Sequence, residues 1–113
     1  MDKLLIVSGQ KPWEEADFAG EALEEEELAE PPKYSVIMHN DDYTTMDFVI
    51  EVLIRFFGHT HERAMKIMLQ IHEKGRGTAG TYSFEIAETK ANQVMNLARD
   101  EGHPLRCTIE PVD

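Results

Sequence analysis

The chain has 113 residues and a net charge of −11 at pH 7, so it fits one domain with a single core. The acidic balance argues against nucleic acid as a partner, and the lone Cys107 excludes a disulfide framework and a multi-cysteine zinc site, as is typical of a reducing cytoplasm. Residues 4–7 are too short for a signal-peptide core and no run could cross a bilayer, so we expect a cytoplasmic protein that does not contact a membrane.

Residues 1–32 form a predicted disordered acidic extension. They hold ten acidic residues and two lysines, including the run of glutamates at 24–27, and the boundary lies at Pro31-Pro32. Mutual repulsion and few apolar side chains disfavour a packed structure. The composition favours a solubilising tail, and the alternative is a flexible arm that a partner holds, with Trp13 and Phe18 as anchors.

From residue 33 to residue 113 the pattern is that of a folded core. An alternating strand over residues 34–39 precedes a helix capped by Thr44, with Asp47 completing a box-like pair and Gly58 ending it. Apolar residues repeat at helical spacing in this helix. Those expected to face inward are Met46, Val49, Ile50, Leu53 and Phe57.

The second half of the core continues in the same way. Thr60 opens a helix that Gly75 ends, residues 77–82 read as a strand, Ser83 caps a third helix that stops near Gly102, and residues 105–110 alternate as a final strand. The order β-α-α-β-α-β predicts an α+β fold with helices packed on one face of a small three-stranded antiparallel sheet. The expected buried stripes of these two helices are Ala64, Ile67, Met68 and Ile71, then Ala87, Ala91, Val94 and Ala98.

Several motifs of known chemistry do not fit their surroundings. Residues 75–80 match G-x-G-x-x-G, but a helix precedes the glycines and a strand follows, which is the reverse of a dinucleotide site. His59 and His61 can both point into solvent and have no further ligand nearby, so we expect no metal and no cofactor. Catalysis by His72 with Cys107, or by Asp41 with Asp42, lacks a nucleophile motif, so we expect no enzyme activity.

The most informative segment is residues 39–46, where an amide and two carboxylates stand between an apolar strand and an apolar helix. Such a turn suits a ligand with one cationic end and one apolar end. His72 follows Met68 by four residues, hence on the same helix face. Two interpretations stay open: His72 is an ordinary surface histidine, or it faces the turn at 40–42 across a pocket floored by apolar side chains of both helices, namely Met46, Val49 and Met68.

Four separated motifs together resemble the ClpS family, the bacterial adaptors that deliver N-degron substrates to the Clp AAA+ protease. The likeness spans residues 33–111. The motifs are Asn40-Asp41-Asp42-Tyr43-Thr44-x-Met46-x-Phe48-Val49, Met68-Leu69-x-Ile71-His72, Glu88-Thr89-Lys90 and His103-Pro104-Leu105-x-Cys107-Thr108.

The resemblance implies a pocket for the first residue of a substrate chain, either Leu, Phe, Tyr or Trp. Asn40, Asp41 and His72 would take the α-ammonium, with Asp42 adding charge, and Met46 would be the gate that rejects β-branched residues. Glu85 and Lys90 match the face that docks on the N-terminal domain of a ClpA-type unfoldase, which would also engage the acidic extension. The implied hydrophobic lining is Thr44, Met46, Val49, Met68, Ile71 and Leu105.

Two departures from the family pattern bear on specificity. His39 stands where an aliphatic residue is usual and could narrow or polarise one pocket wall, and Thr45 replaces a usual proline and could loosen the first helical turn. Two other classes compete with the peptide-binding adaptor. One is a purely structural interaction domain, since such acidic modules also resemble the factor-binding domain of the ribosomal stalk protein. The other is a small hydrolase, which would show turnover.

Overall fold

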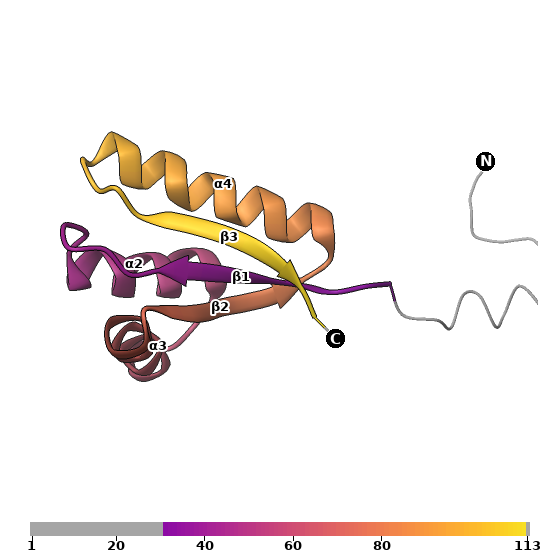
Figure 1. The fold of residues 1–113 in the computed structure, drawn as a ribbon, viewed down its shortest axis with the longest axis horizontal. Coiled ribbons are helices and arrows are strands. Elements are labelled where there is room, and N and C mark those ends of the chain that lie inside the picture. Colours follow the sequence, from indigo (N-terminus) through magenta and orange to yellow (C-terminus); the bar gives the residue numbers. More distant parts are fainter. Residues whose placement is uncertain (1–30, 113) are drawn as a thin grey trace, which may run out of the picture. The chain divides into compact units, whose positions relative to one another are not determined.

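A computed structural model describes residues 31–112, and its element order is the predicted β-α-α-β-α-β (Figure 1). The predicted extension, residues 1–32, lies almost wholly outside that range. Among residues 31–112, no helix is long and apolar enough to cross a membrane. The elements are β1 (Tyr34–His39), α2 (Met46–Phe57), α3 (His61–Lys74), β2 (Arg76–Tyr82), α4 (Phe84–Asp100) and β3 (Arg106–Pro111).

The sheet has β1 at its centre, antiparallel to β2 on one side and to β3 on the other (Figure 1). Met38 is paired with Gly77 on β2 and with Cys107 on β3. The register with β2 shifts between Val36 and Ile37, and this irregularity leaves Ala79 without a partner on β1. Because β1 is central, β2 and β3 are both edge strands, and the register shift distorts β2 locally.

The core lies between one face of the sheet and the three helices, as predicted. Val36 and Met38 are fully buried against the helices, and the expected stripes of α3 and α4 are all buried. The stripe of α2 differs from the prediction, because Ile50 is only half-buried and Met46 exposes 51% of its surface. Met46 is the first residue of its helix and lies at the end of the buried face, where little packs against it.

The helix ends follow the predicted glycines but not every predicted cap. Gly58 and Gly75 adopt left-handed conformations with φ of 73° and 89°, which end α2 and α3. Thr60 caps α3 as predicted. The cap of α2 is Thr45, whose hydroxyl accepts from the Phe48 N–H at 3.1 Å, so the prediction of a Thr44 cap was wrong. This hydrogen bond stabilises the first turn of α2, which Thr45 was expected to loosen.

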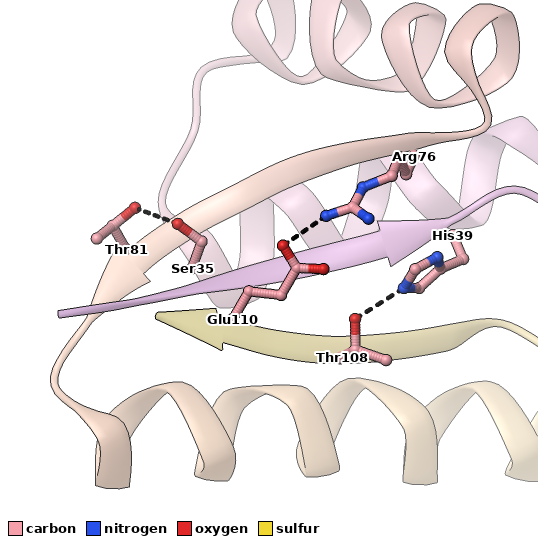
Figure 2. A network of polar contacts seen from close by, with 6 residues as sticks. All are labelled: Ser35, His39, Arg76, Thr81, Thr108 and Glu110. Atoms are coloured by element: carbon pink, nitrogen blue, oxygen red, sulfur yellow. Dashed lines mark hydrogen bonds and ion pairs between the residues drawn. The ribbon is translucent and has the colours of Figure 1, made fainter. Parts of the chain in front are cut away.

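The other face of the sheet carries a polar network (Figure 2). His39 Nε2 lies 2.7 Å from Thr108 Oγ1, and Arg76 bridges to Glu110 at 2.6 Å across β1. Burial, with the nearby charges of Arg106 and Arg76, lowers the pKa of His39. Because strand side chains alternate, His39 points away from the helices. It therefore does not line a pocket wall that the helices form.

The burial of α2 predicts that substitutions at two neighbouring residues will change the free energy of unfolding by very different amounts. Leu53 is fully buried, whereas Ile54 exposes 38% of its surface. We expect Leu53→Ala to lower the free energy of unfolding by about 2–5 kcal/mol, because it removes packed carbons and leaves a cavity. Ile54→Ala is the matched control and should change that energy by roughly 1 kcal/mol or less. Denaturant unfolding measures both, and equal losses would contradict this assignment of the core.

Candidate functional site

The segment between β1 and α2 is organised by the Asp41 carboxylate. Its Oδ1 accepts the backbone N–H groups of Tyr43 and Thr44 at 2.8 and 2.7 Å, and its Oδ2 accepts the Thr44 hydroxyl at 2.7 Å. An Asp side chain that bonds the backbone two and three residues ahead shapes the chain into a tight turn. The turn delivers the chain to Thr45, where α2 begins.

The same bonds keep Asp41 ionised. Burial alone would raise its pKa, but the hydrogen bonds from Thr44 and Tyr43, aided by the nearby His103, outweigh burial and lower the pKa below 3.8. An ionised carboxylate offers about four acceptor positions. Three are used within the turn, so about one position on Oδ2 is left for a ligand.

Backbone contacts bring two other segments to this turn. The Asn40 N–H donates to the Gly75 carbonyl at 2.9 Å, which places the turn beside the last turn of α3, where His72 lies. On the other side, His39 pairs with Arg106 in β3, so Leu105 is next to the start of the turn. The described contacts therefore join the turn, the end of α3 and the residues before β3.

His103 also lies near the turn, although no sequence pattern assigned it a role. Its ring centroid lies 4.4 Å from that of Phe48, and its charge acts on Asp41. The side chain is half-buried. It formed part of the motif with Leu105, but only the folded chain shows that it lies near enough to the carboxylate to help lower the pKa of Asp41.

The predicted lining residues divide by burial. Val49, Met68, Ile71 and Leu105 expose only 4–7% of their surface and belong to the core, while Thr44 is half-buried. Met46 stands at the surface. The polar candidates Asn40, Asp42 and His72 are exposed, as a water-facing entrance requires. The predicted site residues thus comprise exposed polar side chains, buried apolar side chains and one exposed methionine.

Glu85 and Lys90 lie on α4. Glu85 is exposed in the first turn of the helix, but Lys90 is half-buried. The Lys90 ammonium donates to the Phe56 carbonyl at 2.7 Å and lies 5.8 and 5.2 Å from the ring centroids of Phe57 and Tyr82. Lys90 thus closes the last turn of α2 against α4, a contact that sequence spacing did not reveal.

The remaining candidates look less reactive in the structure than in the sequence. Cys107 is buried in the core, and burial raises the pKa of its thiol to about 12, so it holds its proton at neutral pH and is a poor nucleophile. His59 was expected in solvent, but its Nε2 lies 2.6 Å from the Ala79 carbonyl. Within residues 31–112, no three His, Cys, Asp or Glu side chains gather as a metal site would.

The Asp41 turn makes a prediction about stability. Because the folded pKa lies below 3.8, ionised Asp41 contributes stability that is present above the unfolded pKa and is lost as pH falls through the folded pKa. Asn can accept the same backbone N–H groups without charge, so Asp41→Asn should keep the turn but lose this contribution.

Urea unfolding from about pH 5 to about pH 2 measures the effect. The stability difference between the wild type and Asp41→Asn should shrink as pH falls. Asp42→Asn is the matched control, because Asp42 is exposed and shows no hydrogen bond among the described residues. A difference for Asp41→Asn that stays constant with pH would contradict the role given to the carboxylate.

Comparison with known proteins agrees with this arrangement. Residues 29–108 match the family described as ATP-dependent Clp protease adaptor protein ClpS. The chain is 55% identical over 92 residues to the ATP-dependent Clp protease adapter protein ClpS of Oleidesulfovibrio alaskensis, covering 81% of this chain and 88% of the relative. The corresponding protein of Ruegeria sp. is 44% identical over 108 residues, covering 96% of each chain.

A solved structure is similar as well. The structure of Agrobacterium tumefaciens ClpS2 bound to L-phenylalaninamide has a TM-score of 0.71 and 35% identity, and the match covers 74% of this chain and all of that one. The motifs, the fold and these relatives agree, and the chain belongs to the ClpS family of Clp protease adaptors.

Proposed function

We propose that this protein binds substrates by a free N-terminal Leu, Phe, Tyr or Trp and delivers them to a Clp AAA+ unfoldase–protease in the cytoplasm. One observation supports the proposal most: an ionised carboxylate turn is tied to the end of α3, the helix that carries His72 and the buried Met68 and Ile71. The ligand of the similar solved structure, L-phenylalaninamide, combines a free amine with an aromatic side chain. It therefore has a cationic group that could pair with a carboxylate and an apolar group that could contact apolar side chains.

The cationic end of the ligand would meet the polar rim. An α-ammonium has three N–H donors, and acceptors are available on Asn40, on the remaining position of Asp41 and on a neutral His72. Asp42 is exposed beside them and adds negative charge without a bond to the turn. Because Asp41 is largely occupied within the turn, Asn40 and His72 carry a greater share of the direct contacts than the sequence suggested.

The apolar end would enter among Thr44, Met46, Val49, Met68, Ile71 and Leu105. Four of these expose under a tenth of their surface, so an incoming side chain must displace neighbours. Met46 and Met68 are suited to this movement, because a methionine side chain is unbranched and adapts its shape. A β-branched ligand is stiff near its backbone and would collide with Met46 at the entrance.

Neither end is sufficient by itself. A charge-assisted hydrogen bond contributes about 1.5–3 kcal/mol, and burial of a Leu or Phe side chain contributes about 1.5–3 kcal/mol. Association costs about 4–15 kcal/mol. Binding therefore needs the ammonium and the bulky side chain together, which restricts recognition to the first residue of a chain.

We further propose that the α4 surface docks on the N-terminal domain of a ClpA-type unfoldase. Glu85 is exposed and can form an ion pair with that partner. The ammonium of Lys90 is already held by the Phe56 carbonyl, so Lys90 would shape the docking surface as well as contribute charge. The acidic residues 1–32 would serve as the arm that the unfoldase engages.

Recognition of a free N-terminus gives the first test. A peptide beginning with Phe should bind, and its acetylated twin should bind at least roughly tenfold more weakly, because acetylation removes the charge and donors. His72→Ala should weaken binding of the free peptide. His61→Ala is the control, since His61 is exposed at the opposite end of α3.

Calorimetry or fluorescence anisotropy measures these affinities. Equal binding of the two peptides would overturn the proposal, and no binding of either would favour a purely structural interaction domain. Hydrolysis of either peptide would instead favour an enzyme.

The gate gives a second test. Met46→Ala should admit peptides that begin with Ile or Val, because it shortens the side chain at the entrance, while Phe peptides continue to bind. Met65→Ala is the matched control, since Met65 is also a partly exposed methionine but is not among the proposed lining residues. Unchanged rejection of Ile and Val by the Met46 variant would contradict its role as the gate.

A further inference from the structure

A second hollow lies between α3 and the edge strand β2. It is a cavity of about 270 Å³ that is open on one side. One wall comes from a single side of α3 and the other from the distorted part of β2. The lining residues are His59, Arg63, Lys66, Ile67, Gln70, Thr78, Ala79, Gly80 and Thr81.

This cavity is separate from the candidate site described above. Side chains at i, i+3 and i+7 share one side of a helix. Arg63, Lys66 and Gln70 have that spacing and line the cavity. Met68 and His72 follow Lys66 and Gln70 by two residues, which turns them about 200° around the helix axis. The two sides of α3 therefore serve different surfaces.

The charge of the cavity opposes that of the chain. Its lining has two permanent cations, Arg63 and Lys66, an imidazole from His59 and no carboxylate, although the whole chain carries −11. Gln70 and Thr78 add hydrogen-bonding groups, whereas the Thr81 hydroxyl is bonded to that of Ser35 at 3.2 Å. Basic and hydroxyl side chains around a hollow favour an anionic ligand, and carboxylates pair well with Arg and Lys.

The neighbouring backbone favours an extended polypeptide. β2 is an edge strand, and Ala79 has no partner on β1 because of the register shift. The Ala79 carbonyl instead bonds Nε2 of His59, a cavity residue, so this one carbonyl of β2 is directed toward the hollow. Edge strands with such groups bind extended peptides by adding a strand.

We propose that the groove between α3 and β2 binds an extended acidic segment of a partner protein, with its carboxylates at Arg63 and Lys66 and its backbone along β2 near Ala79. The adaptor would then have a second protein-binding site, distinct from the site for a free N-terminus. The proposal depends on the cavity and its charges and does not rest on recognition of an N-terminal residue.

The test uses the full chain and a capped, fluorescently labelled poly-glutamate peptide, whose acetylated end cannot enter the first site. Anisotropy should show binding that weakens with added salt, because the contacts are ionic and partly exposed. Arg63→Glu and Lys66→Glu should each weaken binding by roughly tenfold or more. Lys74→Glu is the matched control, because it makes the same charge change on α3 outside the cavity.

Four further measurements make the outcome decisive. A poly-glutamine peptide should not bind, and the amide resonances of residues 78–81 should shift with the acidic peptide. Arg63→Gln removes the positive charge without introducing a negative one, so it is the milder variant if Arg63→Glu does not fold. It should weaken binding less than Arg63→Glu does. Equal binding of the glutamine peptide, or equal loss with Lys74→Glu, would overturn the proposal. The Phe-initiated peptide should bind the Arg63→Glu variant normally, so failure here is distinguishable from failure of the first site.

Discussion

The Asp41 carboxylate is the interaction on which the candidate site depends. By accepting three hydrogen bonds from Tyr43 and Thr44 it shapes the turn after β1, and the turn determines where α2 begins. The start of α2 in turn places Met46 at the surface. The three hydrogen bonds also keep the Asp41 carboxylate ionised, so the group that shapes the turn also gives it a negative charge.

The rest of the fold supports this turn from two directions. The Asn40 N–H is bonded to Gly75, at the end of α3, and the pairing of β1 with β3 brings in the residues before Arg106. These are backbone contacts, which depend little on side-chain identity. The site is therefore held on rigid elements, while the side chains expected to move are the flexible methionines.

Helix α3 contributes to two surfaces of opposite charge. One side presents His72 near the carboxylate turn, and the other presents Arg63 and Lys66 to the groove along β2. The separation follows from helix geometry, since residues two apart point in nearly opposite directions. Under the two proposals above, one side of this helix would serve a cationic ammonium and the other an acidic segment.

Sequence patterns by themselves determined the order of elements, the buried stripes of α3 and α4, and the glycines that end α2 and α3, because these depend on local periodicity and backbone conformation. At the start of α2 the pattern offered two neighbouring hydroxyls, and the structure shows that Asp41 takes that of Thr44 and leaves Thr45 to cap the helix. Tertiary structure alone decided that His59, Lys90 and His103 have partners far along the chain. The contacts of His59, Lys90 and His103 join residues 20 to more than 50 positions apart, and their geometry depends on how the helices pack on the sheet.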